Sequence, residues 1–141
     1  MKQTKCAYVF LTMDLPHYGH LKIIQRARAV SDYVIAGILT DKAVMSYKRR
    51  PIMPYWQRKS IAEEFRSVDM VMMQKSRDPT ENLKKIHKDN PRWKIILIHG
   101  SDWKNVPGQK YVESIGGRLF QPPYYKPLST TKIIEKIKQS R

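Results

Sequence analysis

Two histidines three residues apart are the clearest candidates for chemistry in this chain. His17 and His20 flank Gly19 in the segment Asp14-Leu-Pro-His-Tyr-Gly-His20, where an apolar run gives way to a helical pattern. A strand that turns into a helix offers free backbone N–H groups and a helix dipole, which favour a bound anion. Imidazoles one turn apart could donate hydrogen bonds to phosphate oxygens and stabilise charge during phosphoryl transfer. The alternatives are a metal site, which needs three or more ligands, and a histidine that only caps the helix.

A basic loop is the second candidate segment. Residues 48–58 read Lys-Arg-Arg-Pro-Ile-Met-Pro-Tyr-Trp-Gln-Arg, and Lys42 precedes them. The cations could neutralise a triphosphate, although a charge run by itself is most often a solvated loop.

Two more segments have residues suited to phosphate or nucleotide binding. In His99-Gly-Ser-Asp-Trp103, Gly100 permits close backbone approach and Asp102 could hold a cation or a ligand hydroxyl. Trp103 could line a base pocket, although a tryptophan after a strand is as often part of the core. Ser129-Thr-Thr-Lys132 places three hydroxyls at the start of a helix, which makes an anion cradle or a simple N-cap.

Alternating strand and helix patterns must position these segments. The apolar and amphipathic periods predict strands at 7–12, 33–39, 68–73, 94–98 and 118–120, and helices at 19–30, 54–65, 80–87, 109–115 and after Ser129. Residues 41–50 are expected to form a polar loop, and Gly116-Gly117 to stop a helix. This alternation predicts one α/β domain over residues 1–141, a Rossmann-like, doubly wound parallel sheet of about five strands with helices on both faces. Ligands of such sheets bind beyond the carboxyl ends of the strands.

The composition narrows the partners. The 141 residues include 27 Lys and Arg against 12 Asp and Glu, a formal net charge of +15, which attracts nucleic acids, anionic membranes or phosphorylated small molecules. No basic-aromatic strand platform or reading helix supports nucleic-acid binding. No apolar run is long enough to cross a membrane, and the start leaves no room for a cleavable signal. Cys6 is the only cysteine, which excludes an internal disulfide. We therefore expect a cytoplasmic protein that binds neither nucleic acid nor membrane.

The motifs together resemble the HxGH cytidylyltransferase-like nucleotidyltransferase family. Asp14 to His20 is similar to the family's GxFDxxHxGH signature, and Ser129-Thr-Thr-Lys-Ile resembles its ISTTKI-like segment. The family includes glycerol-3-phosphate, ethanolamine-phosphate and choline-phosphate cytidylyltransferases and the heptose-phosphate adenylyltransferases. Residues 50–59, 99–104 and 123–130 are most similar to the branch found with phosphoenolpyruvate mutase in phosphonate biosynthesis.

The resemblance implies a function and a set of site residues. It implies transfer of CMP from CTP to a small phosphonate or phosphate. It also implies that Mg²⁺ is held mainly by the CTP phosphates and that the protein is a homodimer. His17, His20 and Lys48 would be catalytic. The implied nucleotide-binding residues are Thr12, Asp14, Gly19, Gly100, Asp102, Ser129, Thr130 and Thr131, with Asp102 also at the metal. The implied acceptor-binding residues, some of them holding the site's framework, are Arg58, Arg66, Trp103, Tyr124, Tyr125 and Lys126.

Three departures from the family pattern bear on the acceptor and on packing. Thr12 and Met13 replace the usual Gly and Phe, and Ser101 replaces a frequent second acid. Tyr124-Tyr-Lys-Pro-Leu stands where glycerol-3-phosphate enzymes carry an arginine, which favours an acceptor such as 2-aminoethylphosphonate or a hydroxyalkylphosphonate. The two tyrosines could receive a substrate ammonium or simply pack against the last helix. Glycerol-3-phosphate cytidylyl transfer, and adenylyl transfer from ATP to a sugar phosphate, are the alternatives.

Overall fold

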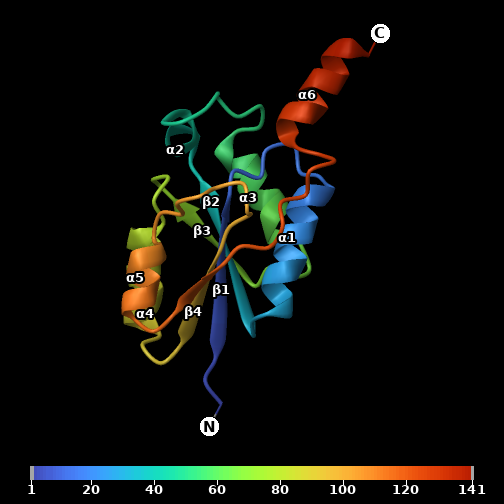
Figure 1. Cartoon of the computed structure of the whole chain (residues 1–141). Coiled ribbons are helices and arrows are strands. Elements are labelled where there is room, and N and C mark those ends of the chain that lie inside the picture. The colour runs from blue at the N-terminus through green and yellow to red at the C-terminus, as the bar shows by residue number, and fades with distance from the viewer. Residues whose placement is uncertain (1, 141) are drawn as a thin grey trace.

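The computed structural model describes residues 2–140, which form an α/β fold around one parallel sheet (Figure 1). The strands are β1 (Lys5–Leu11), β2 (Tyr33–Leu39), β3 (Met70–Gln74), β4 (Lys94–Ile98) and β5 (Arg118–Phe120). Their order in the sheet is β3-β2-β1-β4-β5, and every neighbouring pair is parallel. The predicted five-stranded, doubly wound sheet is confirmed.

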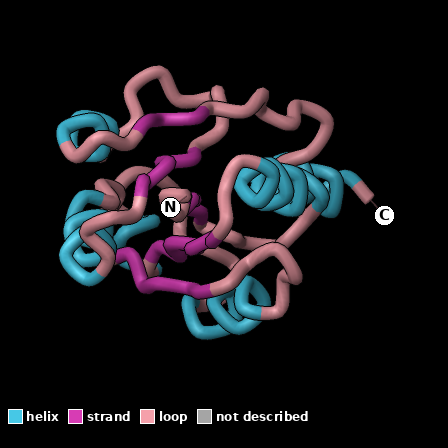
Figure 2. The backbone as a smooth tube through the Cα atoms, turned by 90° about the horizontal axis from the view of Figure 1, so that it is seen from below, coloured by secondary structure: helices cyan, strands magenta, loops and turns pink. Residues whose placement is uncertain are grey.

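Helices cover both faces of this sheet. They are α1 (Tyr18–Ala29), α2 (Asp41–Met45), α3 (Tyr55–Glu63), α4 (Thr80–Asp89), α5 (Gln109–Ser114) and α6 (Thr130–Gln139). Alternate residues of β1 point to opposite faces, so that Ala7 packs with α1 and α3 whereas Tyr8 packs with α4 and α5. Figure 2 shows the strands as a central layer with helices on either side.

The segment 41–50 differs from the prediction. Residues 41–45 form α2, where a polar loop was expected. Thr40 caps this short helix, because its hydroxyl accepts a hydrogen bond from the Ala43 N–H at 3.1 Å, and Ala43 and Val44 are buried. In the sequence, Thr40 and Asp41, followed after Lys42 by the apolar Ala43 and Val44, were the signal for a helix start. After α5, Gly116 adopts a φ of 85°, as the predicted glycine stop requires.

The last helix, α6, extends away from the rest of the chain (Figure 1). None of its residues is buried; Ile133 and Ile134 are half-buried, and Ile137 is 64% exposed. Ser129 caps it as predicted by accepting from the Lys132 N–H at 3.1 Å. Among residues 2–140, no helix combines the length and the apolar character that a membrane span needs.

Candidate active site

A cavity of about 660 Å³ lies at the carboxyl ends of the strands. Its walls come from the end of β1, the first turns of α1, the chain after α2, the residues after β4 and the segment that leads into α6. Because β1 lies between β2 and β4, this is where the strand order reverses, the usual ligand position of such sheets.

The two histidines of the motif hold each other in place at the start of α1. The Gly19 N–H donates to His17 Nδ1 at 2.9 Å, and the His17 N–H donates to His20 Nδ1 at 3.1 Å. The ring centroids are 4.0 Å apart. Since both Nδ1 atoms accept hydrogen bonds, this network assigns the proton of each neutral ring to Nε2.

The same surroundings keep the imidazoles neutral. Burial, and then the neighbouring His17 and Lys48, lower the pKa of His20 to about 3. Burial also lowers the pKa of His17. Both side chains line the cavity, so that they offer it two neutral N–H donors at physiological pH.

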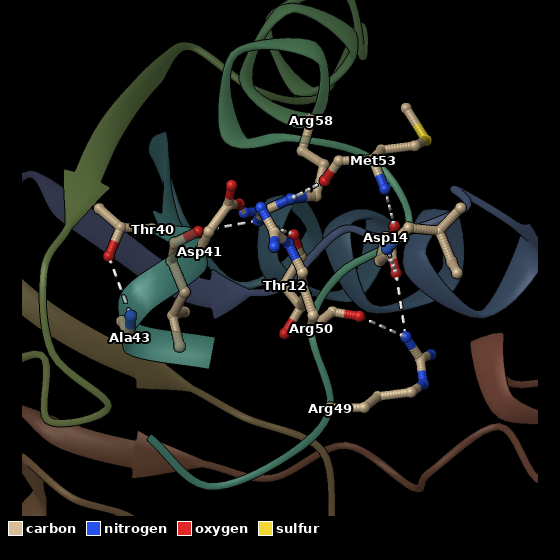
Figure 3. Close-up of polar contacts among 11 residues, drawn as sticks. Thr12, Asp14, Thr40, Asp41, Ala43, Arg49, Arg50, Met53 and Arg58 are labelled. Carbon is tan, nitrogen blue, oxygen red and sulfur yellow. Dashed lines mark hydrogen bonds and ion pairs between the residues drawn. The ribbon is translucent and has the colours of Figure 1, made fainter. Parts of the chain in front are cut away.

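The loop between β1 and α1 has an unusual backbone. Met13 and Leu15 have φ values of 60° and 47°, a left-handed conformation that costs free energy for residues other than glycine. Such a conformation persists only where neighbouring groups hold it. Figure 3 shows two residues that do so, Arg58 and Asp14.

Arg58 holds the loop from inside the protein. Its side chain is 0% exposed, and its Nη1 donates to the carbonyls of Thr12 at 2.6 Å and Leu39 at 2.8 Å. Its Nε donates to the Met53 carbonyl at 2.9 Å, and Nη2 to Asp41 Oδ1 at 2.6 Å (Figure 3). Of the two roles that the resemblance implies for Arg58, the geometry supports the framework role and not the acceptor contact, because Arg58 does not line the cavity and positions the loop.

Asp14 holds the loop from the other side. Its carboxylate is 3% exposed and accepts from the backbone N–H groups of Ile52 at 2.8 Å and Met53 at 2.9 Å, and from Arg49 Nη1 at 3.3 Å. Its backbone carbonyl accepts from Thr130 Oγ1 at 2.6 Å. Because both carboxylate oxygens are engaged, the role that the geometry supports for Asp14 is to join α1, the basic loop and α6, rather than to contact a nucleotide.

Lys48 and Arg49 differ in their surroundings. Lys48 lines the cavity, and no carboxylate of residues 2–140 lies within ion-pair distance of it. Burial of the ammonium group, followed by the charge of Arg49, lowers its pKa. Arg49 is instead paired with Asp14. Of the two cations of the basic loop that line the cavity, Lys48 is thus the one without a carboxylate partner among the described residues.

The residues after β4 form the opposite wall. A Cβ at Gly100 would lie 2.8 Å from Asp102 Oδ1, so a side chain there would displace the Asp102 carboxylate. The His99 ring stacks on Trp103 with centroids 4.0 Å apart and planes at 22°. Asp102 Oδ1 lies 3.8 Å from His99 Nδ1, and burial lowers the pKa of His99. His99, Gly100, Asp102 and Trp103 all line the cavity.

The segment before α6 closes the cavity. Ser129, Thr130 and Thr131 line it, together with Tyr124 and Tyr125. Thr130 already donates its hydroxyl proton to Asp14, so that Ser129 and Thr131 have the hydroxyl protons available to a ligand. The Tyr125 ring meets the edge of Tyr18 at a centroid distance of 5.1 Å.

Two further predicted site residues lie elsewhere. Arg66 and Lys126 are exposed and do not line the cavity, so the structure does not support an acceptor contact for either. The backbone carbonyl of Lys126 instead accepts from Lys132 Nζ.

Among the cavity residues, sequence reasoning missed Lys22, Arg26 and Tyr47, and it gave no individual role to Arg49 and His99, which lie in two of its candidate segments. The i, i+4 spacing of Lys22 and Arg26 along α1 was an available signal for one face. Four cations and two acids, Asp14 and Asp102, line the cavity, and Asp14 is saturated by donors. The cavity is therefore suited to polyanionic ligands.

One cavity at the edge of a parallel sheet thus brings together neutral histidine donors, free hydroxyls and an unpaired lysine. This arrangement suits enzymes that act on nucleoside triphosphates. Comparison with known proteins identifies the family within this class of enzymes. The family model for cytidylyltransferase-like domains matches residues 11–136. The chain belongs to the cytidylyltransferase-like family of nucleotidyltransferases.

Individual relatives agree with this assignment. The chain is 32% identical over 131 residues to the bifunctional protein HldE of Citrifermentans bemidjiense, a match that covers 90% of the chain and 26% of HldE. It is 34% identical over 129 residues to HldE of Geotalea uraniireducens, covering 89% of the chain and 25% of HldE. The chain thus spans about a quarter of the length of the curated relatives it matches.

Solved structures share the fold at lower identity. The lipopolysaccharide core biosynthesis protein from Thermoplasma volcanium superposes with a TM-score of 0.70 at 16% identity, covering 87% of this chain and 99% of that one. A putative nicotinate-nucleotide adenylyltransferase from Vibrio parahaemolyticus gives 0.64 at 17% identity, covering 99% and 90%.

Proposed function

We propose that this chain transfers CMP from CTP to a small phosphonate or phosphate acceptor and releases pyrophosphate. The observation that carries the proposal is the pair of neutral imidazoles, whose Nδ1 atoms are occupied and whose Nε2 protons remain for a ligand in the cavity. The volume of about 660 Å³ suits small-molecule substrates. The choice of CTP rests on the resemblance to cytidylyltransferases.

The reaction needs one displacement at phosphorus. An oxygen of the acceptor phosphonate or phosphate attacks the α-phosphorus of CTP, and the bond from that phosphorus to the bridging oxygen of the β-phosphate breaks. The electron pair leaves with pyrophosphate. His17 and His20 donate hydrogen bonds to phosphate oxygens as negative charge builds up, and Lys48 draws the nucleotide and acceptor phosphates together.

The donor set fits Mg²⁺ as an ion held mainly by substrate. Residues 2–140 contain no cluster of three or more His, Cys, Asp or Glu side chains that could hold a metal by themselves. Asp102, with a side chain 39% exposed in the cavity wall, would supply one carboxylate, while phosphates and water supply the rest. A bound magnesium ion would neutralise phosphate charge.

ATP is the alternative nucleotide, because the family includes adenylyltransferases as well as cytidylyltransferases. A pyrophosphate-release assay with the purified chain and Mg²⁺ separates the two. We expect CTP with 2-hydroxyethylphosphonate to exceed both ATP with a sugar phosphate and CTP with glycerol 3-phosphate in kcat/KM. Preference for ATP would replace the nucleotide assignment, and preference for glycerol 3-phosphate would replace the acceptor assignment.

The homodimer and the cytoplasmic location remain predictions. Light scattering on the purified chain measures the first, and fractionation of the source cells measures the second.

A further inference from the structure

One arginine that the proposed reaction does not use lies against the cavity wall. Arg77 belongs to the loop between β3 and α4. Its guanidinium carbon lies 4.3 Å from the ring centroid of Trp103 and 4.9 Å from that of Tyr47. These rings meet edge to face at 5.9 Å, and both line the cavity. Arg77 therefore fills the corner between two aromatic side chains of the site.

The buried side chain of Gln74 holds the backbone of the loop that carries Arg77. Gln74 Nε2 donates to the carbonyls of Ser76 at 2.9 Å and Arg77 at 3.3 Å. Its Oε1 accepts from the Tyr8 hydroxyl at 2.6 Å in the core. No carboxylate within residues 2–140 forms an ion pair with Arg77. The backbone that carries Arg77 is thus held to the core, and its exposed guanidinium lies over the two rings without a carboxylate partner among the described residues.

The faces of the two rings are already occupied. The His99 imidazole, stacked at 4.0 Å and 22°, covers one face of Trp103. A face covered in this way leaves no room for a guanidinium at 4.3 Å, so Arg77 takes the opposite face. The Tyr47 ring has Lys48 Nζ at 5.5 Å in addition to Arg77.

This arrangement affects which substrate head groups can bind beside Tyr47 and Trp103, the aromatic wall of the cavity. Open aromatic faces would attract a substrate ammonium through cation–π interactions. Here the guanidinium of Arg77, which is not itself among the lining residues, lies over a face of each ring, and a second cation near these rings would be repelled. Lys22, Arg26, Lys48 and Arg49 add positive charge around the cavity, and Asp102 is the one lining carboxylate not saturated by backbone donors.

We propose that Arg77 is a specificity-determining residue that excludes alkylammonium head groups and selects acceptors with a neutral or anionic tail, such as hydroxyalkyl- or carboxyalkylphosphonates and the corresponding phosphates. The proposal rests on the proposed function, and it separates two acceptors that the sequence left together, hydroxyalkylphosphonates and 2-aminoethylphosphonate. Of the two tyrosines before α6 that line the cavity, Tyr125 packs edge to face with Tyr18. This leaves Tyr124, 40% exposed, as a single open ring, whereas a cation-binding cage needs several.

A matched pair of acceptors tests this selection. 2-Hydroxyethylphosphonate and 2-aminoethylphosphonate are similar in size and differ in the charge of the tail. We expect wild-type kcat/KM with CTP to favour the hydroxyl compound by about tenfold or more, and Arg77→Ala to reduce that ratio about tenfold. Lys75→Ala, which removes an exposed charge from the same loop, should leave the ratio unchanged. Arg77→Met, which keeps an apolar contact with both rings, should lose the repulsion and give an intermediate ratio.

A titration with tetramethylammonium provides a readout independent of turnover. Calorimetry should detect binding to Arg77→Ala, once circular dichroism shows that it is folded, and none to the wild type or to Lys75→Ala. Equal acceptor ratios in wild type and Arg77→Ala, or equal tetramethylammonium binding, would overturn the selection. An equal shift in Lys75→Ala would assign it to diffuse charge instead. Absence of turnover with every nucleotide and acceptor would refute the proposed function, while the titration would still decide the role of Arg77.

Discussion

The proposed phosphate-binding end of the cavity, at His17 and His20, and the aromatic wall of the cavity are built in different ways. At the phosphate-binding end, His17 and His20 are fixed by backbone N–H groups a few residues away, and Arg58 and Asp14 hold the preceding loop through backbone atoms. At the aromatic wall, Tyr47, Arg77 and Trp103 come from three separate segments and contact one another through side chains. We infer that the first region tolerates little change, whereas the second can be altered to change the acceptor.

The largest effect is expected from removing the buried arginine of the phosphate-binding end. Arg58→Ala leaves Asp41 without its partner and three buried or half-buried carbonyls without a donor, which should cost about 3–5 kcal/mol of unfolding free energy. Urea denaturation measures it. Arg66→Ala, an exposed arginine just beyond the same helix, is the control and should change stability by less than about 0.5 kcal/mol. Similar losses in both variants would contradict the positioning role.

The next effect concerns the imidazoles themselves. His17→Ala or His20→Ala should lower kcat by on the order of a hundredfold, with a much smaller change in KM for CTP, because the Nε2 donors act on charge that develops in the transition state. Steady-state pyrophosphate release measures both constants. His87→Gln, a histidine outside the cavity, serves as the control. Near-normal turnover of His17→Ala would remove the central part of the mechanism.

A smaller difference should separate two neighbouring cations. Lys48→Ala should reduce kcat/KM by about tenfold or more, whereas Arg49→Ala should act mildly, because Arg49 is paired with Asp14 and Lys48 has no such partner. The pair shares one loop, so each variant is the control of the other. Equal losses would indicate general electrostatic attraction by the loop and would contradict a specific phosphate contact by Lys48.

A last effect, on stability rather than on rate, is a dependence of the unfolding free energy on pH. His20 has a folded pKa of about 3, below the ordinary value of about 6.5, so the unfolded chain binds the proton first as pH falls. Stability should therefore decrease below about pH 6.5, by up to about 1.4 kcal/mol per pH unit from this residue. Urea titrations between pH 7 and 5 should show a shallower slope for His20→Gln than for wild type. An unchanged slope would argue that His20 is not buried in this way.

Much of the fold could be predicted because its signals are local. The apolar runs at residues 33–39 and 94–98 coincide with β2 and β4, and the Ser129 cap and the stop at Gly116 follow from side-chain and backbone preferences of single residues. Helix α2 was missed because five residues give almost no periodicity.

The site was predicted less evenly for the same reason. His17 and His20 owe their geometry to a three-residue spacing, which a sequence displays. The direction of Arg58 depends on carbonyls as distant as Thr12, and the stack of Arg77 on Trp103 depends on how two loops meet. No local pattern encodes such contacts, so an arginine expected to meet the acceptor turned out to lie in the interior, and one that was overlooked lies against the cavity wall.

The outward course of α6 has a practical consequence. The helix begins at Thr130, whose hydroxyl donates a hydrogen bond to the backbone carbonyl of Asp14 in the loop before the histidines. It continues into solvent as far as Gln139. Ten residues of helix span about 15 Å, so a tilt of about ten degrees at Thr130 would move Gln139 by roughly 2.6 Å. The exposed end of α6 therefore amplifies a small change of angle at Thr130 into a measurable displacement. A spin label or fluorophore there would register small rearrangements around the histidine motif from outside the cavity.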